Sequence, residues 1–400
     1  MNNETRKETQ VLPKDVRCVG ADDLTLSLFE NQYPVQPMGV SYNSYLILDE
    51  KIAVMDSVDA RAADEWLAKL AHELNGRSPD YLVISHMEPD HSGSILRLAE
   101  KYQEMKLVGN TKTFTMLRQF FGAKAPTDDR LLEVGEGETL PLGAHTLHFM
   151  LAPMVHWPEV MVAYEETEKL LFSADAFGRF GALSRTAGAP WAPQARRYYY
   201  NIVGKYGAQV QALLKKAAAL EIETICPLHG PVLTGEALGE ALRLYDLWSR
   251  WQSESPDDIL LAHASIHGNT ARAAELFKQK LEAKGARVTL CDLTTTEVSY
   301  AVANAFYCGK LVLACSTYDG GLFPPMEEFL SHLQAKGFRD RSVGLMENGS
   351  WAPAAARLMR AKLEEMKDLR VCGTVVSLRS ALSPASEAQI DALTTELCAK

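Results

Sequence analysis

Two histidines and two acids crowd into one short segment of this 400-residue chain. Residues 85–95 read SHMEPDHSGSI and place His86, Glu88, Asp90 and His91 within six positions. Imidazole and carboxylate groups bind transition metals, and buried ones need a cation to offset their lost hydration. One such residue alone is more often an ordinary polar residue, but four together predict a metal site.

Three further candidate ligands, His156, Asp175 and His229, each come shortly after a predicted strand. Residues two apart in extended chain project to the same side, so strand ends can aim such side chains at one point. A purely structural metal is disfavoured, because closed structural sites are usually rich in thiolates. Ordinary surface or core roles are favoured for histidines inside periodic segments, namely His72, His145, His148 and His332.

The elements that must position these residues come in two sets. In the first set, alternation and apolar runs predict strands at 43–48, 52–55, 107–108, 131–134, 145–151, 160–164, 170–173 and 223–226. Helical spacing predicts helices at 62–74, 95–102, 111–121, 208–220 and 236–251. Strands and helices in this order indicate two sheets with helices outside, an αββα sandwich.

A polar segment at 253–257 carries a helix-breaking proline and is the predicted linker. Beyond it, strands are predicted at 259–264, 287–291, 311–315, 342–346 and 371–376, alternating with helices at 270–283, 326–335, 354–366 and 386–398. Continuous apolar strands separated by helices predict a parallel sheet covered on both faces, as in a five-stranded doubly wound flavodoxin-like domain. We therefore expect one domain at 1–254 and a second at 258–400.

A loop between the first strand and the first helix of the second set is suited to a phosphate. It reads SIHGNT from Ser265 to Thr270. Small hydroxyl residues and glycine there form a nest of backbone N–H groups, and the helix dipole adds partial positive charge. The loop resembles the flavodoxin phosphate loop TxTGNT, with His267 where a threonine is usual. Taken alone, such a loop is about as often a plain helix cap.

Two further loops follow the third and fourth strands of this set, where doubly wound sheets bind ligands. They contain Tyr318 and Trp351, which could flank a planar isoalloxazine ring. FMN is favoured over NAD, because the phosphate loop is not GxGxxG. The residues expected to contact FMN are Ser265, His267, Gly268, Asn269, Thr270, Ser316, Thr317, Tyr318, Asp319, Gly320, Asn348, Gly349, Ser350 and Trp351.

The metal-binding pattern resembles the metallo-β-lactamase-like domain in its flavodiiron form, with the order HxExDH and then His156, Asp175 and His229. Hydrolases of that superfamily usually carry a histidine at the position of Glu88. A carboxylate there adds negative charge and a hard oxygen ligand, which favours iron over zinc. The resemblance implies one iron bound by His86, Glu88 and His156, another by Asp90, His91 and His229, and Asp175 as the bridge between them.

The resemblance covers essentially the full chain and implies a flavodiiron oxidoreductase that reduces dioxygen to water, nitric oxide to nitrous oxide, or both. It also implies an external electron donor, rubredoxin first and reduced deazaflavin coenzyme second, and a head-to-tail homodimer or a tetramer. The alternative is a dizinc hydrolase of the lactonase or thioesterase kind fused to a regulatory flavodoxin domain. A third possibility is an electron carrier with a vestigial metal site.

Composition limits the partners and the compartment. The net charge of −10 gives no reason to expect nucleic acid or an anionic membrane as a partner. Residues 1–14 lack the apolar core of a signal peptide, and no apolar run approaches the roughly 20 residues of a membrane span. Seven single cysteines without a CxxC pair argue against an appended rubredoxin module. We expect a cytoplasmic protein.

Overall fold

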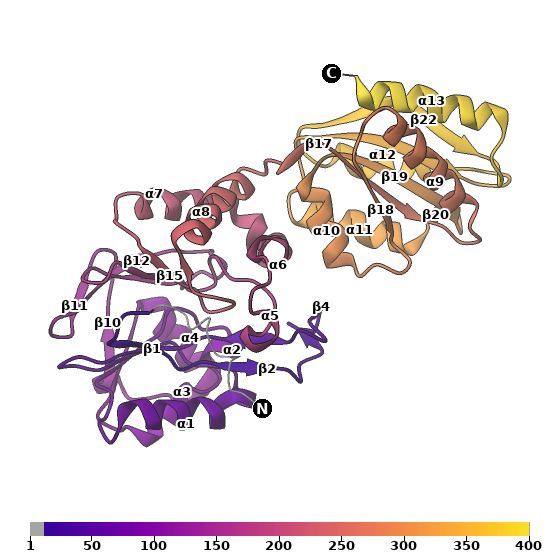
Figure 1. The fold of residues 1–400 in the computed structure, drawn as a ribbon. Coiled ribbons are helices and arrows are strands. Elements are labelled where there is room, and N and C mark those ends of the chain that lie inside the picture. The colour runs from indigo at the N-terminus through magenta and orange to yellow at the C-terminus, as the bar shows by residue number, and fades with distance from the viewer. Residues whose placement is uncertain (1–11, 400) are drawn as a thin grey trace, which may run out of the picture. The chain divides into compact units, whose positions relative to one another are not determined.

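The computed structural model describes residues 12–399, which form two compact units (Figure 1). The first unit comprises the chain up to Tyr199 together with Ala208–Asp246. The second comprises Tyr200–Gly207 together with the chain from Leu247 onward. Each unit has its own hydrophobic core. The domain limits at residues 254 and 258 stay predictions.

The first unit contains a sandwich of two six-stranded sheets. The first sheet has the order β1 Val16–Cys18, β6 Tyr45–Ile47, β7 Ala53–Met55, β8 Tyr81–Val83, β9 Lys106–Gly109 and β10 Leu131–Glu133. The second has the order β11 Thr139–Pro141, β12 Thr146–Leu151, β13 Met161–Glu165, β14 Leu170–Phe172, β15 Thr224–Cys226 and β16 Leu233–Thr234. Apolar side chains of both sheets form one core, in which the Tyr45 and Phe172 rings lie 5.5 Å apart.

Helices cover both outer faces of the sandwich. In Figure 1, α1 and α3 lie on one side of the two sheets, and α7 and α8 lie on the other. Helix α1 buries one face because Trp66, Leu70 and Leu74 recur at helical spacing. Burying each leucine contributes about 1.5–3 kcal/mol. The α-helices between residues 12 and 249 are α1 Ala63–Leu74, α2 Pro89–Ser92, α3 Ile95–Lys101, α4 Thr111–Phe121, α5 Leu183–Thr186, α6 Trp191–Tyr198, α7 Gly207–Ala217 and α8 Gly235–Ser249. The predicted αββα sandwich is confirmed.

Several short elements of the first unit were not predicted. They include β2 Ala21–Asp23, β3 Leu28–Phe29, β4 Tyr33–Pro34 and β5 Val40–Tyr42. Strands of two or three residues are too short to show a period-two pattern. The end of the HxExDH motif is helical, since Pro89–Ser92 forms a helical turn with proline at its start.

The second unit is built on a parallel sheet with the order β18 Val288–Asp292, β17 Ser255–Ala264, β19 Cys308–Tyr318, β21 Arg341–Asn348 and β22 Leu369–Leu378. In this sheet Leu261 pairs with Leu290 on one side and with Val312 on the other. The order 2-1-3-4-5 is that of flavodoxin-like domains, so the predicted doubly wound fold is confirmed. Its helices are α9 Asn269–Ala283, α10 Val298–Tyr307, α11 Pro324–Ala335, α12 Ala355–Glu364 and α13 Pro384–Cys398.

All five strands of this sheet extend beyond their predicted ends by one residue or more. Strand β17 begins at Ser255, inside the predicted linker. Strands β19 and β21 run to Tyr318 and Asn348, so residues expected in ligand loops lie on strand ends instead. Polar residues there interrupt the apolar runs, but backbone pairing of β19 with β20 Gly321–Leu322 continues the strand.

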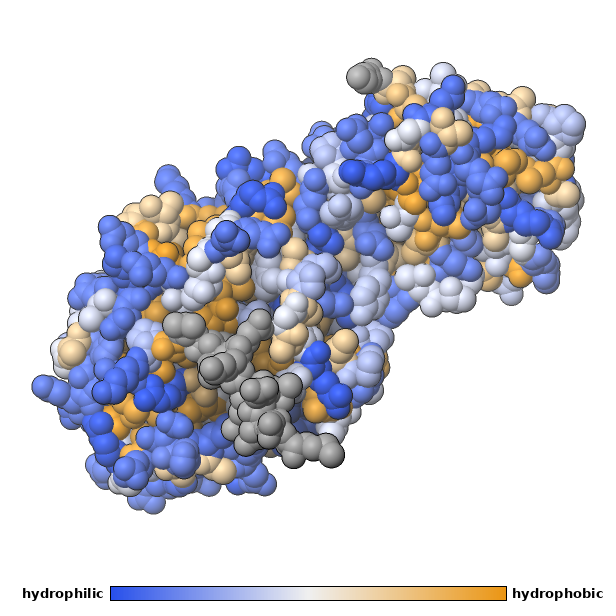
Figure 2. All heavy atoms as spheres, in the orientation of Figure 1, coloured by the Kyte–Doolittle hydropathy of each residue, from blue (hydrophilic) through white to orange (hydrophobic). Residues whose placement is uncertain are grey.

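Hydrophilic residues cover most of the face shown in Figure 2, with apolar residues scattered between them. Within residues 12–399, no helix has both the length and the apolar character needed to cross a membrane. Among the large apolar side chains in this part of the chain, Trp351 is the most exposed, at 87%.

Candidate metal centre

The candidate metal ligands follow strands of both sheets in the first unit. His86 and Glu88 come after β8, whereas His156, Asp175 and His229 come after β12, β14 and β15. These last three strands run in the same direction, because β12 and β14 are each antiparallel to β13 and β15 is parallel to β14. The segments that follow them therefore leave the second sheet at the same end.

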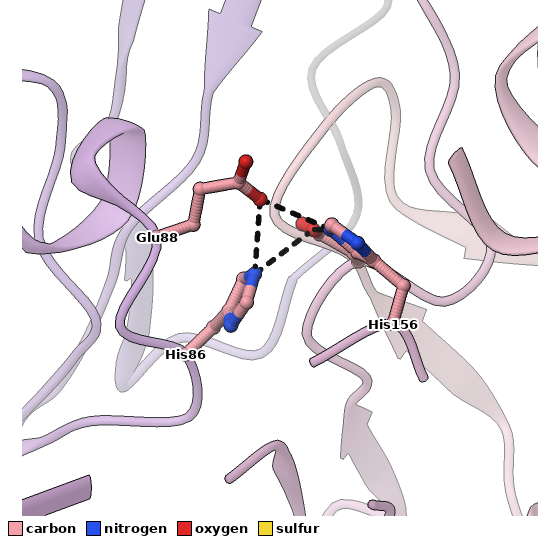
Figure 3. A group of neighbouring side chains, drawn as sticks. His86, Glu88 and His156 are labelled. Atoms are coloured by element: carbon pink, nitrogen blue, oxygen red, sulfur yellow. Dashed lines mark hydrogen bonds and ion pairs between the residues drawn. The ribbon is translucent and has the colours of Figure 1, made fainter. Parts of the chain in front are cut away.

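The first cluster contains His86, Glu88, His156 and Asp175. Figure 3 shows the first three with their side chains pointing toward one another. Glu88 Oε2 lies 3.2 Å from His86 Nε2 and 3.0 Å from His156 Nε2. Asp175 Oδ2 lies 3.5 Å and 3.1 Å from the same two nitrogens. Donors bonded at about 2.1 Å to one metal ion lie roughly 3.0–3.4 Å apart, so these separations suit one coordination shell. We call His86, Glu88 and His156 the first metal position.

The second cluster contains Asp90 and His91 of α2 together with His229, and we call these residues the second metal position. His91 Nε2 lies 3.1 Å from His229 Nε2, and Asp90 Oδ2 lies 3.3 Å from each of these nitrogens. The second position therefore offers the same donor types as the first, two imidazoles and one carboxylate.

Asp175 faces the two positions with different oxygens. Its Oδ2 lies 3.1 Å from His156 Nε2, and its Oδ1 lies 3.2 Å from His91 Nε2. Asp175 Oδ1 and both carboxylate oxygens of Asp90 are buried without a hydrogen-bond partner in the part of the chain that the structure describes. A buried carboxylate without hydrogen bonds is costly unless a cation compensates it, so these residues fit a pair of bridged metal ions.

The cluster also shifts the ionisation of its own members. Burial favours the neutral form of Asp175, but the charge on His91 and a hydrogen bond from His156 hold the pKa of Asp175 well below its usual value. Burial opposes the imidazolium of His156, yet its contacts with Asp175 and Glu88 raise its pKa to about 9. Protons on these histidines occupy the place that metal ions would take, so metal binding would release protons.

Two groups that hold the ligands in place were not predicted. Glu159 Oε1 lies 2.7 Å from His86 Nδ1 and accepts a hydrogen bond from the Met87 amide at 2.8 Å. His229 Nδ1 lies 2.7 Å from the carbonyl oxygen of Ser41. Such contacts fix the ring so that Nε2 points at the metal. The only signal for Glu159 in the sequence is its place shortly after a predicted ligand, and the Ser41 carbonyl leaves no signal at all.

A cleft of about 570 Å³ opens beside the clusters and reaches Glu88 and Asp90. Its walls include Glu30, Asp59 and Arg61. Glu30 as a whole residue is exposed, but its carboxyl group is largely buried. This burial and the charge of Glu88 raise the pKa of Glu30 to about 7. The Arg61 guanidinium is paired with Asp59 at 3.0 Å, so acidic groups dominate the cleft. No sequence motif marks Glu30, and it was not predicted.

The three tyrosines Tyr198, Tyr199 and Tyr200 are all buried. The Tyr198 ring lies 5.5 Å from the His229 ring, and its hydroxyl has no hydrogen-bond partner within residues 12–399. Tyr200 instead stacks on Phe306 at 4.0 Å. Of the three, Tyr198 is the one whose ring lies beside a candidate ligand.

The second unit contains a cavity of about 490 Å³ at the ends of its strands. Every residue predicted to contact FMN lines this cavity except Gly268. Gly268 has a φ of 87°, which favours glycine, and its amide donates to Ser265 Oγ at 3.1 Å as the chain turns into α9. Further lining residues that were not predicted are Ile266, Ala352 and Ser380. Ser380 follows β22, and no sequence motif marks the end of that strand.

Hydrogen bonds join the loops around this cavity. Thr270 Oγ1 lies 2.9 Å from Ser316 Oγ and accepts a hydrogen bond from Asn348 Nδ2 at 3.3 Å. Backbone N–H groups at the start of α9 suit a phosphate. Tyr318 and Trp351 are 44% and 87% exposed, so their faces are available to a planar ring. These residues fit FMN.

Comparisons with known proteins agree with this organisation. Residues 40–230 match the family described as "ODP family beta lactamase". The rubredoxin-oxygen oxidoreductase of Megalodesulfovibrio gigas is 27% identical over 356 residues, which cover 87% of each chain. A protein of Moorella thermoacetica named nitric oxide reductase is 26% identical over 358 residues, which cover 87% of this chain and 88% of that relative.

The solved structure of rubredoxin oxygen:oxidoreductase from Desulfovibrio gigas has a TM-score of 0.89 and 25% identity to this chain. The match covers 98% of this chain and 97% of that one, and so includes the sandwich and the doubly wound unit. The relatives are named as oxidoreductases. The matched domain, the relatives and the fold together show that this chain resembles the flavodiiron proteins over nearly its full length.

Proposed function

We propose that this protein reduces dioxygen to water, nitric oxide to nitrous oxide, or both, at a pair of iron ions that receive electrons from bound FMN. The proposal depends on one observation above all, the convergence of seven donor side chains on two adjacent positions, with the carboxylate of Glu88 in the first. Relatives named for oxygen and for nitric oxide reduction support the same chemistry.

In this proposal each metal position would hold one iron, and Asp175 would supply one oxygen to each. The ligands would be His86, Glu88 and His156 for one iron, and Asp90, His91 and His229 for the other. Hard oxygen donors suit iron better than a nitrogen-rich set does. When bound, the reduced metal pair supplies electrons to a gas molecule at its open coordination positions. The contribution of the chain is to hold the two positions side by side with fixed imidazoles.

FMN would occupy the cavity of the second unit. The backbone amides between Ser265 and Thr270, together with the α9 dipole, would bind the phosphate. Tyr318 and Trp351 would contact the faces of the ring. When bound, FMN accepts electrons in pairs and releases them singly, which suits an acceptor made of two iron ions.

The electrons would come from an external donor. Rubredoxin is the first candidate, because a relative is named for it, and reduced deazaflavin coenzyme is the second. We also propose a cytoplasmic location and a head-to-tail homodimer, or a tetramer, in which the flavin of one subunit serves the irons of its partner. Sedimentation at the assay concentration tests the assembly, and a fully active monomer would contradict it.

The alternative function is hydrolysis of a lactone or thioester by two zinc ions. Glu88 disfavours it, because this superfamily's hydrolases usually have a histidine at that position.

Metal and flavin analysis followed by turnover measurements tests the function. We expect about two irons and one FMN per chain, and rapid reoxidation of the photoreduced protein by dioxygen, nitric oxide or both. Anaerobic steady-state rates with each gas and one common reductant would then give the preference. Two zincs per chain with esterase turnover, or no reaction with either gas, would overturn the proposal.

A further inference from the structure

The two metal positions offer matching donors but differ in what lies behind them. In the first, His86 Nδ1 lies 2.7 Å from the Glu159 carboxylate. In the second, His229 Nδ1 lies 2.7 Å from the neutral carbonyl group of Ser41. His91 Nδ1 is buried and has no hydrogen-bond partner among the residues that the structure describes. We therefore look to these contacts of the Nδ1 atoms for a difference in metal affinity between the two positions.

Glu159 is built rigidly into the fold. Its side chain is fully buried, and Oε1 accepts a hydrogen bond from the Met87 amide as well as meeting His86. Its own carbonyl accepts a hydrogen bond at 2.6 Å from Asn110 Nδ2, and the Asn110 side chain also caps α4. Because an ionised carboxylate only accepts hydrogen bonds, it fixes the proton of His86 on Nδ1 and leaves Nε2 free to bind a metal.

His86 is the one side chain whose hydrogen bond to the Glu159 carboxylate the structure shows within residues 12–399. Its second oxygen, Oε2, is buried without a hydrogen-bond partner in residues 12–399. The Trp157 ring packs edge-on against His86, with 5.2 Å between the ring centres, and keeps the imidazole in place. Among residues 12–399, no hydrogen bond holds Nδ1 of His91, so the position of the proton on that ring is not fixed before a metal binds.

We infer that Glu159 is a positioning residue that makes the first metal position the tighter of the two and gives its iron the lower reduction potential. The inference rests on the proposed diiron function. A carboxylate behind a ligating imidazole strengthens the donor, and a stronger donor favours both metal binding and the more highly charged ferric state. The iron at His86, Glu88 and His156 is then the first to bind and the first to be oxidised.

Stepwise binding of ferrous iron to the metal-free protein tests this order. Under anaerobic dialysis at graded concentrations of free iron, we expect the wild-type protein to fill in two separate steps. In E159Q, which keeps the shape and removes the charge, the dissociation constant of the tight step should rise about 10–100-fold while the weak step stays in place. Two unchanged steps in a folded E159Q protein would overturn the inference.

A redox titration supplies a readout that a purely structural role would not move. Electron paramagnetic resonance of the mixed-valent state follows the two potentials separately. In E159Q the lower of the two potentials should shift upward toward the higher one. Two unshifted potentials in E159Q would contradict the inference.

Glu165 provides the matched control. It is fully buried on β13, and its two oxygens accept hydrogen bonds from the amides of Thr167 and Glu168. E165Q removes a buried carboxylate from β13, the strand that begins two residues after Glu159, without touching a candidate ligand. We expect both binding steps and both potentials of E165Q to match those of the wild-type protein.

The wild-type protein alone keeps the inference testable if E159Q does not fold. Crystals of metal-free protein soaked with one equivalent of ferrous iron should show their main anomalous peak at the first position. A main peak at the second position, or equal peaks at both, would overturn the inference but leave the diiron function intact. No peak at either position, even with excess iron, would instead refute the diiron function itself.

Discussion

Glu88 Oε2 lies 3.0 Å from His156 Nε2, although one residue follows β8 of the first sheet and the other follows β12 of the second. The pair can form only when the two sheets are packed on each other. Its carboxylate is also the point at which this chain departs from the histidine-rich pattern of the related hydrolases. Packing of the two sheets therefore brings the negative charge of Glu88 into the candidate metal site.

Replacing Glu88 with histidine should change the metal preference. E88H removes a negative charge and exchanges a hard oxygen donor for nitrogen, so the iron-to-zinc ratio of the purified protein should fall about tenfold or more. Metal analysis after expression with equal iron and zinc measures this ratio. E30Q, which removes a carboxyl group from the wall of the same cleft, should leave the ratio unchanged. A wild-type ratio in E88H would show that Glu88 does not select the metal.

Removing the Tyr198 hydroxyl should slow the reaction without disturbing the cofactors. That hydroxyl is buried without a partner in residues 12–399, and its ring lies against His229, so it can donate a hydrogen bond to a substrate at the metals. We expect turnover of the preferred gas to fall about tenfold in Y198F, with iron and FMN contents unchanged. Y164F is the control, because the Tyr164 hydroxyl donates instead to the Glu221 carbonyl. Equal rates in both variants would exclude this role.

Most of the second unit, apart from α10 Val298–Tyr307 and the short β20, could be predicted because its elements are long and regular. The helix predicted at 270–283 is α9 Asn269–Ala283, and the strand predicted at 311–315 lies within β19 Cys308–Tyr318. Apolar runs of this length carry their own periodicity. The N-terminal strands, such as β4 Tyr33–Pro34, depend on pairing with distant chain and have no such pattern.

The convergence of the seven candidate ligands could be anticipated because imidazole and carboxylate residues follow apolar strands within a few residues, as His86 follows β8. Glu159 and Glu30 carry no such mark. Glu159 acts through a hydrogen bond to His86, and Glu30 reaches the cleft from an irregular segment with a φ of 51°. Contacts of this kind arise from the packing of loops, which local sequence patterns do not encode.

Truncating Trp351 should weaken FMN binding and leave the fold unaffected. The side chain is 87% exposed and lines the cavity, so it contributes little to the core but offers a face for stacking. In W351A we expect a loss of about 1 kcal/mol, or roughly a fivefold rise in the dissociation constant for FMN. Quenching of FMN fluorescence on titration with the flavin-free protein measures this dissociation constant. Y300A, which removes another exposed aromatic side chain of this unit, should bind FMN as the wild-type protein does.

Asp49 should make the stability of the first unit depend on pH below about 4. Burial opposes its ionisation, but hydrogen bonds from the amide and ring of His145 lower the pKa of Asp49 to about 2. A carboxyl group with a lowered pKa stabilises the fold above its usual value of 3.8, and this contribution is lost as the pH falls toward 2. D49N should therefore lose about 1–2 kcal/mol of stability at pH 7 and almost nothing near pH 2. Thermal unfolding of the metal-free proteins across this range measures the difference. D64N alters an acid whose side chain is 89% exposed and should show no such trend, and a D49N deficit that stays constant with pH would contradict the assignment.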